Sequence, residues 1–158
     1  MGTEIERKFL VASDAWKCLV TTSRRLSQAY LQIEERQSIR VRIDGTSHAS
    51  LAIKSAASGS ARSEHEYEIP LQDAEELFRL RVGAPVHKVR HVIPAGPLKW
   101  EIDEFGGDNA GLVIAEIELP EEGYGVDIPA WVGKEVTNDP RYYNSYLALH
   151  PYSEWPQE

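Results

Sequence analysis

The residues in this sequence best suited to chemistry are like-charged pairs two positions apart. The first pair is Glu4 and Glu6, followed by Lys8, in the segment EIERK. Residues i, i+2 and i+4 share one face of a β-strand, so a strand here presents two carboxylates and an ammonium on one side. Two such carboxylates repel each other unless a cation lies between them, and hard oxygen ligands suit Mg²⁺ or Mn²⁺. For one isolated pair, a solvated strand face is the better explanation.

The same spacing recurs along the chain, and the sign of the charge alternates from one group of segments to the next. Basic residues follow it at Arg40 and Arg42 and at Lys88 and Arg90, and Lys54 ends the segment LAIK. The acidic residues are Glu64, Glu66 and Glu68, then Glu101 and Asp103, then Glu116 and Glu118. This repetition favours a shared role for the charged faces over a series of unrelated surface pairs.

The elements that carry these residues have the period-2 alternation of β-strands. The predicted strands are Glu4–Val11, Ser23–Gln32, Ser38–Ile43, Ala49–Ser55, Ser63–Pro70, Val86–Ile93, Leu98–Phe105 and Leu112–Leu119. Asp44-Gly45 predicts a hairpin turn between the third and fourth strands, and the small polar residues 55–63 predict a loop. Helical patterns cover Ser13–Val20, Asp73–Arg81 and Pro140–His150.

Eight short strands separated by turns indicate a barrel or a sandwich. The faces opposite the charged ones are apolar, as at Ile5 and Phe9 and at Val113 and Ile117. The helices could cover these faces from outside, which would turn the charged faces into the lumen. An eight-stranded barrel is just wide enough to hold a small ligand. We therefore expect one domain (1–158) of the mainly β class, an antiparallel closed barrel with helices packed outside. The alternative is an ordinary barrel with an apolar interior.

The composition narrows the choice of partners. The net charge is −8, which would repel nucleic acid and anionic membranes rather than attract them. No apolar stretch approaches the roughly 20 residues that span a bilayer. The single cysteine rules out an internal disulfide framework and is compatible with a reducing compartment. We expect a cytoplasmic protein that binds neither nucleic acid nor membrane.

The segment EIERK resembles the ExExK signature of the CYTH superfamily, the triphosphate tunnel metalloenzymes. The resemblance continues in order through the chain, with VRI after Arg40, Lys54, RSEHEYEIP, HKVRHVI, WEIDEFGG, GLVIAEIEL and WVGKEVTNDPRYYNSYLA. At this length the chain is similar to small bacterial tripolyphosphatases. The resemblance implies an eight-stranded antiparallel tunnel, dependence on a divalent metal, here Mg²⁺ or Mn²⁺, and hydrolysis or cyclisation of a triphosphate.

The resemblance also implies roles for individual residues. Phosphate binding falls on Lys8, Arg40, Arg42, Lys54, Lys88 and Arg90. Metal binding falls on Glu4, Glu6, Glu64, Glu66, Asp103, Glu116 and Glu118, and the choice among Glu64, Glu66 and Glu68 stays open. The predicted catalytic set includes Glu4, Glu6, Lys8 and Lys54 from this resemblance. Tyr30 is added on other grounds: its strand is expected to run toward the tunnel, which makes it a candidate for contact with substrate or the attacking water.

The function that follows is hydrolysis of tripolyphosphate to pyrophosphate and phosphate, because so short a chain leaves little sequence for an organic-group pocket. Alternatives within the superfamily are thiamine triphosphatase, nucleoside triphosphatase and adenylate cyclase. A non-catalytic polyphosphate or nucleotide sensor would need degraded carboxylates, and these are intact. A purely structural barrel would not explain paired charges on six strands. The expected partner is the small triphosphate, and a homodimer is compatible with the family.

Overall fold

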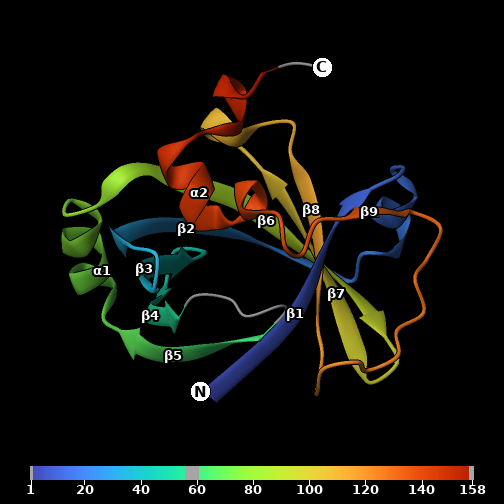
Figure 1. The fold of residues 1–158 in the computed structure, drawn as a ribbon. Coiled ribbons are helices and arrows are strands. Elements are labelled where there is room, and N and C mark those ends of the chain that lie inside the picture. The colour runs from blue at the N-terminus through green and yellow to red at the C-terminus, as the bar shows by residue number, and fades with distance from the viewer. Residues whose placement is uncertain (1, 56–60, 157–158) are drawn as a thin grey trace.

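The chain folds into an antiparallel β-barrel with short helices on its outside (Figure 1). The computed structural model describes residues 2–55 and 61–156. The strands in these ranges are β1 (Gly2–Val11), β2 (Thr22–Ile33), β3 (Gln37–Asp44), β4 (His48–Ser55), β5 (Ala61–Ile69), β6 (Val82–Ala95), β7 (Leu98–Phe105), β8 (Val113–Glu118) and β9 (Val132–Glu135). All eight predicted strands are present, and β9 is a short strand that the alternation did not predict.

Eight of these strands close into a ring. Neighbours pair in the order β5-β4-β3-β2-β6-β7-β8-β1, and β1 then pairs with β5. Every pairing is antiparallel. β1 closes the ring because its residues 2–5 pair with β5 and its residues 6–10 pair with β8. β9 is added at the far end of β1, where Val11 lies opposite Val132. The predicted closed eight-stranded barrel is confirmed.

The barrel is apolar outside, and its interior is charged around the cavity. Alternate residues of a strand face opposite sides, and β7 shows the consequence: Trp100 and Ile102 pack outward while Glu101 lines the interior. Of three buried clusters, the first and third cover this outer face. The second lies on the inner face of the strands, because Val86 and Ile114 are two positions from the cavity-lining Lys88 and Glu116, and it packs against Leu147 and Ala148. The members of the three clusters are, in order, Phe9, Trp16, Ile93, Trp100, Ile102, Ala115, Ile117, Leu119, Trp131 and Val132; Tyr30, Val86, Phe105, Leu112, Ile114, Leu147 and Ala148; and Val41, Ala49 and Ala74.

The helices that cover the barrel are shorter than the sequence predicts. They are η1 (Ala15–Leu19), α1 (Leu71–Phe78), η2 (Gly107–Asn109), η3 (Pro140–Tyr142), α2 (Asn144–Leu149) and η4 (Tyr152–Glu154). α1 starts after Pro70, so Asp73 lies in its first turn and not at its N-cap as expected. The segment predicted as one helix over Pro140–His150 is broken at Tyr143, whose backbone is extended (φ −77°, ψ 139°). No helix in residues 2–55 and 61–156 is long and apolar enough to span a membrane.

The predicted turns are partly confirmed. Asp44 pairs with His48 across the β3–β4 hairpin, and Gly45 takes the positive φ of 64° that the turn requires. The loop predicted over 55–63 is shorter at both ends, because β4 extends to Ser55 and β5 begins at Ala61. Residues 56–60 of that loop lie outside the described residues.

Gly83 sets the distance between β6 and α2. Its φ is +70°, and a methyl group added to its Cα would collide with the backbone carbonyl of Ala148. We expect Gly83→Ala to lower the free energy of unfolding by about 1–2 kcal/mol for the left-handed backbone and by about 1–3 kcal/mol more for the collision. Gly96→Ala is the matched control, since its φ is +62° but no described atom lies within 4 Å of the new Cβ. Equal losses in urea titrations of the two variants would contradict the close approach.

Candidate active site inside the barrel

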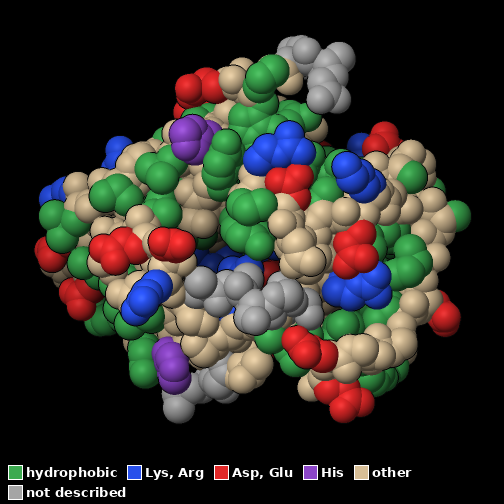
Figure 2. All heavy atoms as spheres, in the orientation of Figure 1, with side chains coloured by type: hydrophobic (Ala, Val, Ile, Leu, Met, Phe, Trp, Pro, Cys, Tyr) green, Lys and Arg blue, Asp and Glu red, His purple; other side chains and the backbone are tan. Residues whose placement is uncertain are grey.

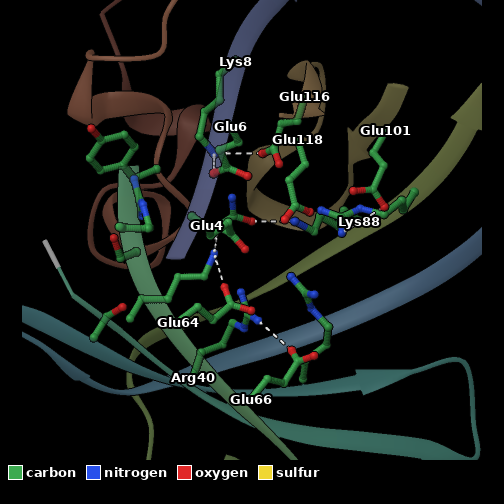
Figure 3. Close-up of a pocket in the computed structure, with 18 of the residues that line it drawn as sticks. Glu4, Glu6, Lys8, Arg40, Glu64, Glu66, Lys88, Glu101, Glu116 and Glu118 are labelled. Atoms are coloured by element: carbon green, nitrogen blue, oxygen red, sulfur yellow. Dashed lines mark hydrogen bonds and ion pairs between the residues drawn. The ribbon is translucent and has the colours of Figure 1, made fainter. Parts of the chain in front are cut away.

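The interior of the barrel holds a cavity of about 320 Å³. Figure 2 shows a hollow near the centre of one face, with Lys or Arg atoms visible inside it. All the site residues predicted from the sequence line this cavity except Asp103, which lies behind the wall: Glu4, Glu6, Lys8, Tyr30, Arg40, Arg42, Lys54, Glu64, Glu66, Lys88, Arg90, Glu116 and Glu118. Residues far apart in the sequence thus converge on one space, as the labelled side chains in Figure 3 show.

The charges in this cavity are segregated into two halves. The alternation of sign along the sequence disappears in space, because the strand order places β6, β2, β3 and β4 side by side and β7, β8, β1 and β5 side by side. The first group carries mainly basic side chains and the second mainly acidic ones. We call these groups the basic half and the acidic half. Lys8, Arg62 and Lys99 are cations that line the cavity from the acidic half.

The basic half contains buried cations without enough counter-charge. Arg42 forms no ion pair among the described residues, and its Nε donates to the neutral Gln28 over 3.0 Å. Burial, with Arg40 and Arg90 nearby, lowers the pKa of Arg42 to about 9. Burial and the neighbouring arginines also lower the pKa of Lys88 to about 7, against the attraction of Asp103. The buried Nε of Arg40 has no hydrogen-bond partner. This wall would be stabilised by a bound anion.

The acidic half has the opposite imbalance. Burial raises the pKa of Glu4 to about 7, and Glu6 and Glu64 add to the rise although Lys54 opposes it. The carboxyl of Glu64 lies close enough to that of Glu4 to contribute to this rise. Burial and three neighbouring carboxylates raise the pKa of Glu118 as well. No three His, Cys, Asp or Glu side chains of the described residues already converge as a complete ligand set. A bound cation would relieve this repulsion.

Ion pairs occur where the two halves meet. At the β6–β7 seam, Asp103 accepts from Arg90 through both oxygens (2.8 and 2.9 Å) and lies 2.7 Å from Lys88 Nζ. Asp103 is fully buried, and Arg90 and Lys88 outweigh the effect of burial and hold its pKa at about 2. Asp103 therefore lies behind the wall of the cavity, and its two oxygens hold Arg90 and Lys88 in place within that wall.

The other seam joins β4 to β5. Lys54 Nζ lies 3.0 Å from Glu4 and 3.0 Å from Glu64, so one ammonium bridges two carboxylates. Arg40 lies 3.4 Å from Glu66, whose side chain is 43% exposed. The ion pair of Glu66 is longer and more exposed than that of Glu64. The structure therefore distinguishes these two carboxylates, which the sequence could not.

Lys8 is a cation within the acidic half. It is 5% exposed, and its Nζ donates to Glu116 over 2.8 Å and lies 3.8 Å from Glu6. These two carboxylates raise the pKa of Lys8 despite its burial, so the side chain stays charged. The contact with Lys8 also holds the pKa of Glu116 well below its ordinary value, against the effect of burial.

Several lining residues were missed by the sequence analysis. Arg62 was assigned to the loop, although it lies two positions before Glu64 on the same face, a spacing that could have found it. Its buried Nε has no hydrogen-bond partner, and its guanidinium lies 5.1 Å from the ring centre of Tyr143. Tyr143 and Asn144 reach the cavity from the break in the C-terminal helix, which no sequence signal indicated. Arg24, Ser38, Lys99, Glu101 and Ser145 complete the lining.

Because Asp103 pairs with two buried cations, its substitution should lower the stability of the protein strongly. Asp103→Asn would leave Arg90 and Lys88 buried without their counter-charge, so we expect the free energy of unfolding at pH 7 to fall by about 3 kcal/mol. The wild-type pKa of about 2 lies below the ordinary 3.8. The stabilisation is therefore present above about pH 4 and is lost as the pH falls through about 2. The free energy of unfolding of Asp103→Asn should therefore fall less than that of wild type between about pH 4 and about pH 2.

Glu104→Gln is the control for this substitution, because Glu104 is the next residue on the same strand. Its side chain is 46% exposed and lies 3.1 Å from His91. Exposed pairs of this kind contribute about 0–1 kcal/mol. A loss in Asp103→Asn no larger than in Glu104→Gln, measured by urea titration at pH 7, would exclude the role of Asp103 as the anchor of the basic half.

Comparison with known proteins agrees with this geometry. The sequence model of the CYTH domain family matches residues 2–143. An inorganic triphosphatase of Acetivibrio thermocellus is 42% identical over 158 residues, which cover 99% of this chain and 100% of the relative. An inorganic triphosphatase of Nitrosomonas europaea is 38% identical over 152 residues, 93% of this chain and 97% of the relative. A crystal structure of an inorganic triphosphatase superposes with a TM-score of 0.66 at 33% identity, covering 94% of this chain and 96% of that one. This chain is a member of the CYTH domain family.

Proposed function

We propose that this chain hydrolyses inorganic triphosphate to pyrophosphate and phosphate inside the barrel. The observation that carries the proposal is the segregation of charge in the cavity, where a wall short of anions faces a wall short of cations. A triphosphate held together with a divalent cation would satisfy both walls at once. The two relatives that match almost the whole chain are inorganic triphosphatases, which supports the same reaction.

The lining favours an inorganic substrate over one with an organic group. Among the described residues that line the cavity, none has an aliphatic side chain, and the aromatic ones are Tyr30 and Tyr143. Pockets for organic ligands are lined mainly by apolar and aromatic groups. A base or a thiazolium ring would therefore find little to pack against, whereas each phosphate of a chain would meet a basic side chain.

The acidic half fits a divalent cation, with Mg²⁺ or Mn²⁺ as the candidates. The groups of this half that can bind a cation are carboxylates, whose oxygens are the ligands that both ions prefer. Burial raises the pKa of Glu4, and Glu6 and Glu64 add to the rise although Lys54 opposes it, which supports a place for a positive charge here. Glu4, Glu6, Glu64 and Glu118 would hold the ion. When bound, the cation supplies Lewis-acid chemistry by polarising phosphoryl oxygens and neutralising the charge that develops on them.

The side chains of the chain itself would supply positioning and charge, which is what phosphoryl transfer mainly requires. Arg40 and Arg42 can donate forked hydrogen bonds to phosphate oxygens, whereas Lys88 acts as a point charge. The anionic substrate would raise the lowered pKa of Lys88 and keep this side chain protonated. Lys54 lies where the two halves meet, so it would contact phosphate while its carboxylate partners contact the cation.

Substrate preference tests this function. Tripolyphosphate can place charged oxygens at both ends of the cavity, whereas a nucleotide uses one end for an ester. A hydrogen bond to a charged group contributes about 1.5–3 kcal/mol, and ~1.4 kcal/mol corresponds to a factor of ten. We expect kcat/KM for tripolyphosphate to exceed that for ATP and for thiamine triphosphate by about tenfold to several hundredfold. Phosphate release is measured under one metal condition. Equal or faster turnover of either organic substrate would contradict the proposal.

Glu4→Gln tests the cation site. The variant keeps the size of the side chain but removes an anionic ligand, so we expect kcat/KM to fall by about two orders of magnitude or more. The concentration of Mg²⁺ or Mn²⁺ needed for half-maximal activity should rise. The folded-state pKa of Glu4 lies above its ordinary value, so ionisation of this carboxyl costs stability as the pH rises through about 7. The metal-free variant should therefore not unfold at a lower temperature than wild type at pH 8.

Arg7→Gln is the control on the same strand. Arg7 faces outward and forms a two-point ion pair with Glu135 (2.9 and 2.8 Å), away from the cavity. Its removal should leave kcat/KM and the metal requirement within about twofold of wild type, as for surface substitutions distant from a site. Hydrolysis by wild type that persists after chelation with excess EDTA, or near-normal activity of Glu4→Gln, would exclude a catalytic cation in the acidic half.

A further inference from the structure

The break in the C-terminal helical segment brings Asn144 into contact with the basic half. Because Tyr143 is extended, α2 begins only at Asn144, and this residue lines the cavity. Asn144 Oδ1 accepts two hydrogen bonds, one from Lys88 Nζ and one from Gln28 Nε2, each over 2.9 Å. Gln28 is fully buried, and its Oε1 accepts from Arg42 Nε over 3.0 Å. One amide thus connects to two of the cations that face the cavity.

The direction of each hydrogen bond in this chain is fixed by the residues at its ends. Lys88 and Arg42 can only donate. Gln28 must therefore turn its oxygen to Arg42 and its amide nitrogen to Asn144, and Asn144 must turn its oxygen to both Gln28 and Lys88. The amide nitrogen of Asn144 is the remaining polar group, and no hydrogen bond among the described residues uses it. This donor belongs to a side chain that lines the cavity.

We propose that Asn144 is a substrate-positioning residue that orients Lys88 and, through Gln28, Arg42, and that donates its own amide group to a phosphate oxygen of the substrate. The inference rests on the proposed function, whose substrate supplies that oxygen. A neutral amide suits this place because it restrains two cations without cancelling their charge. A carboxylate at the same position would hold the cations as firmly but would repel the anion that they bind.

Two variants distinguish the role of the Asn144 amide oxygen, which accepts hydrogen bonds, from that of its amide nitrogen, which donates. Asn144→Ala removes both the acceptor and the donor, so we expect KM for tripolyphosphate to rise by about tenfold to a hundredfold, the effect of losing a hydrogen bond to a charged group. Asn144→Asp retains an acceptor for Lys88 and Gln28, removes the donor and adds a negative charge. It should raise KM more than Asn144→Ala, while the apo protein unfolds at the same or a higher temperature. Loss of a merely structural residue would not raise KM while leaving the thermal stability unchanged or higher.

Tyr146→Phe is the control within the same helix. The Tyr146 ring packs against His150 and Trp155 outside the barrel, so loss of its hydroxyl should leave KM and kcat within about twofold of wild type. Near-normal KM in Asn144→Asp would overturn the proposal, because the donor would then be unused. If Asn144→Ala lost activity only in proportion to its unfolded fraction, the role would be structural and the proposal would also fail. Should Asn144→Ala not fold, the comparison of Asn144→Asp with wild type still decides.

Calorimetric binding of tripolyphosphate to the metal-free protein distinguishes failure of this inference from failure of the proposed function. We expect wild type to bind and both Asn144 variants to bind at least tenfold more weakly. If wild type hydrolyses and binds tripolyphosphate while the variants bind it equally well, the role of Asn144 is wrong and the proposed function stands. If wild type binds tripolyphosphate without hydrolysing it, the proposed function is wrong, and the binding of the variants still tests Asn144.

Discussion

Repulsion between buried like charges is the constraint on which the rest of the structure depends. The strand order gathers cations on one side of a closed lumen and carboxylates on the other, and ion pairs at the seams neutralise only part of them. Arg42 and Glu118 lie away from those pairs, and their pKa values are displaced in the directions that signal missing partners. Such an interior is costly by itself, and an anion together with a cation inside it would lower that cost, as the proposed function requires.

A barrel with this interior needs its stability from elsewhere, and the outer face provides it. Trp16, Trp100 and Trp131 are each at most 5% exposed, and they pack in one cluster between the strands and the segments outside them. Burying a large apolar side chain contributes about 1.5–3 kcal/mol. Around the cavity the usual arrangement of a globular protein is thus inverted, because apolar side chains pack outside the strands and charged ones face inward. The covering segments are therefore part of what makes the active cavity possible.

The sequence predicted the barrel and most of the cavity because both follow from period-2 alternation. Charges at i and i+2 identify a strand face whichever strand later lies beside it. The segregation into halves was not predictable in this way, because it depends on strand order, and β2 lies between β3 and β6 only after folding. Asn144 was equally hidden, since its position follows from the backbone of Tyr143 and not from any charge pattern. The ion pair of Asp103 was hidden for a similar reason, because only the register opposite Arg90 shows which side chain its oxygens accept from.

The position of β1 in the ring has a consequence for how the protein is made. β1 precedes β2–β9 in the chain and is therefore synthesised before them, and its partners are β5, β8 and β9. The β1–β8 pairing joins residues more than 100 positions apart, such as Lys8 and Glu116, so the ring closes only when most of the chain has been synthesised. Until then β1 has an unpaired edge, which is a site for association with other chains. The charged side chains of β1, which face the cavity after folding, oppose such association while this edge is unpaired.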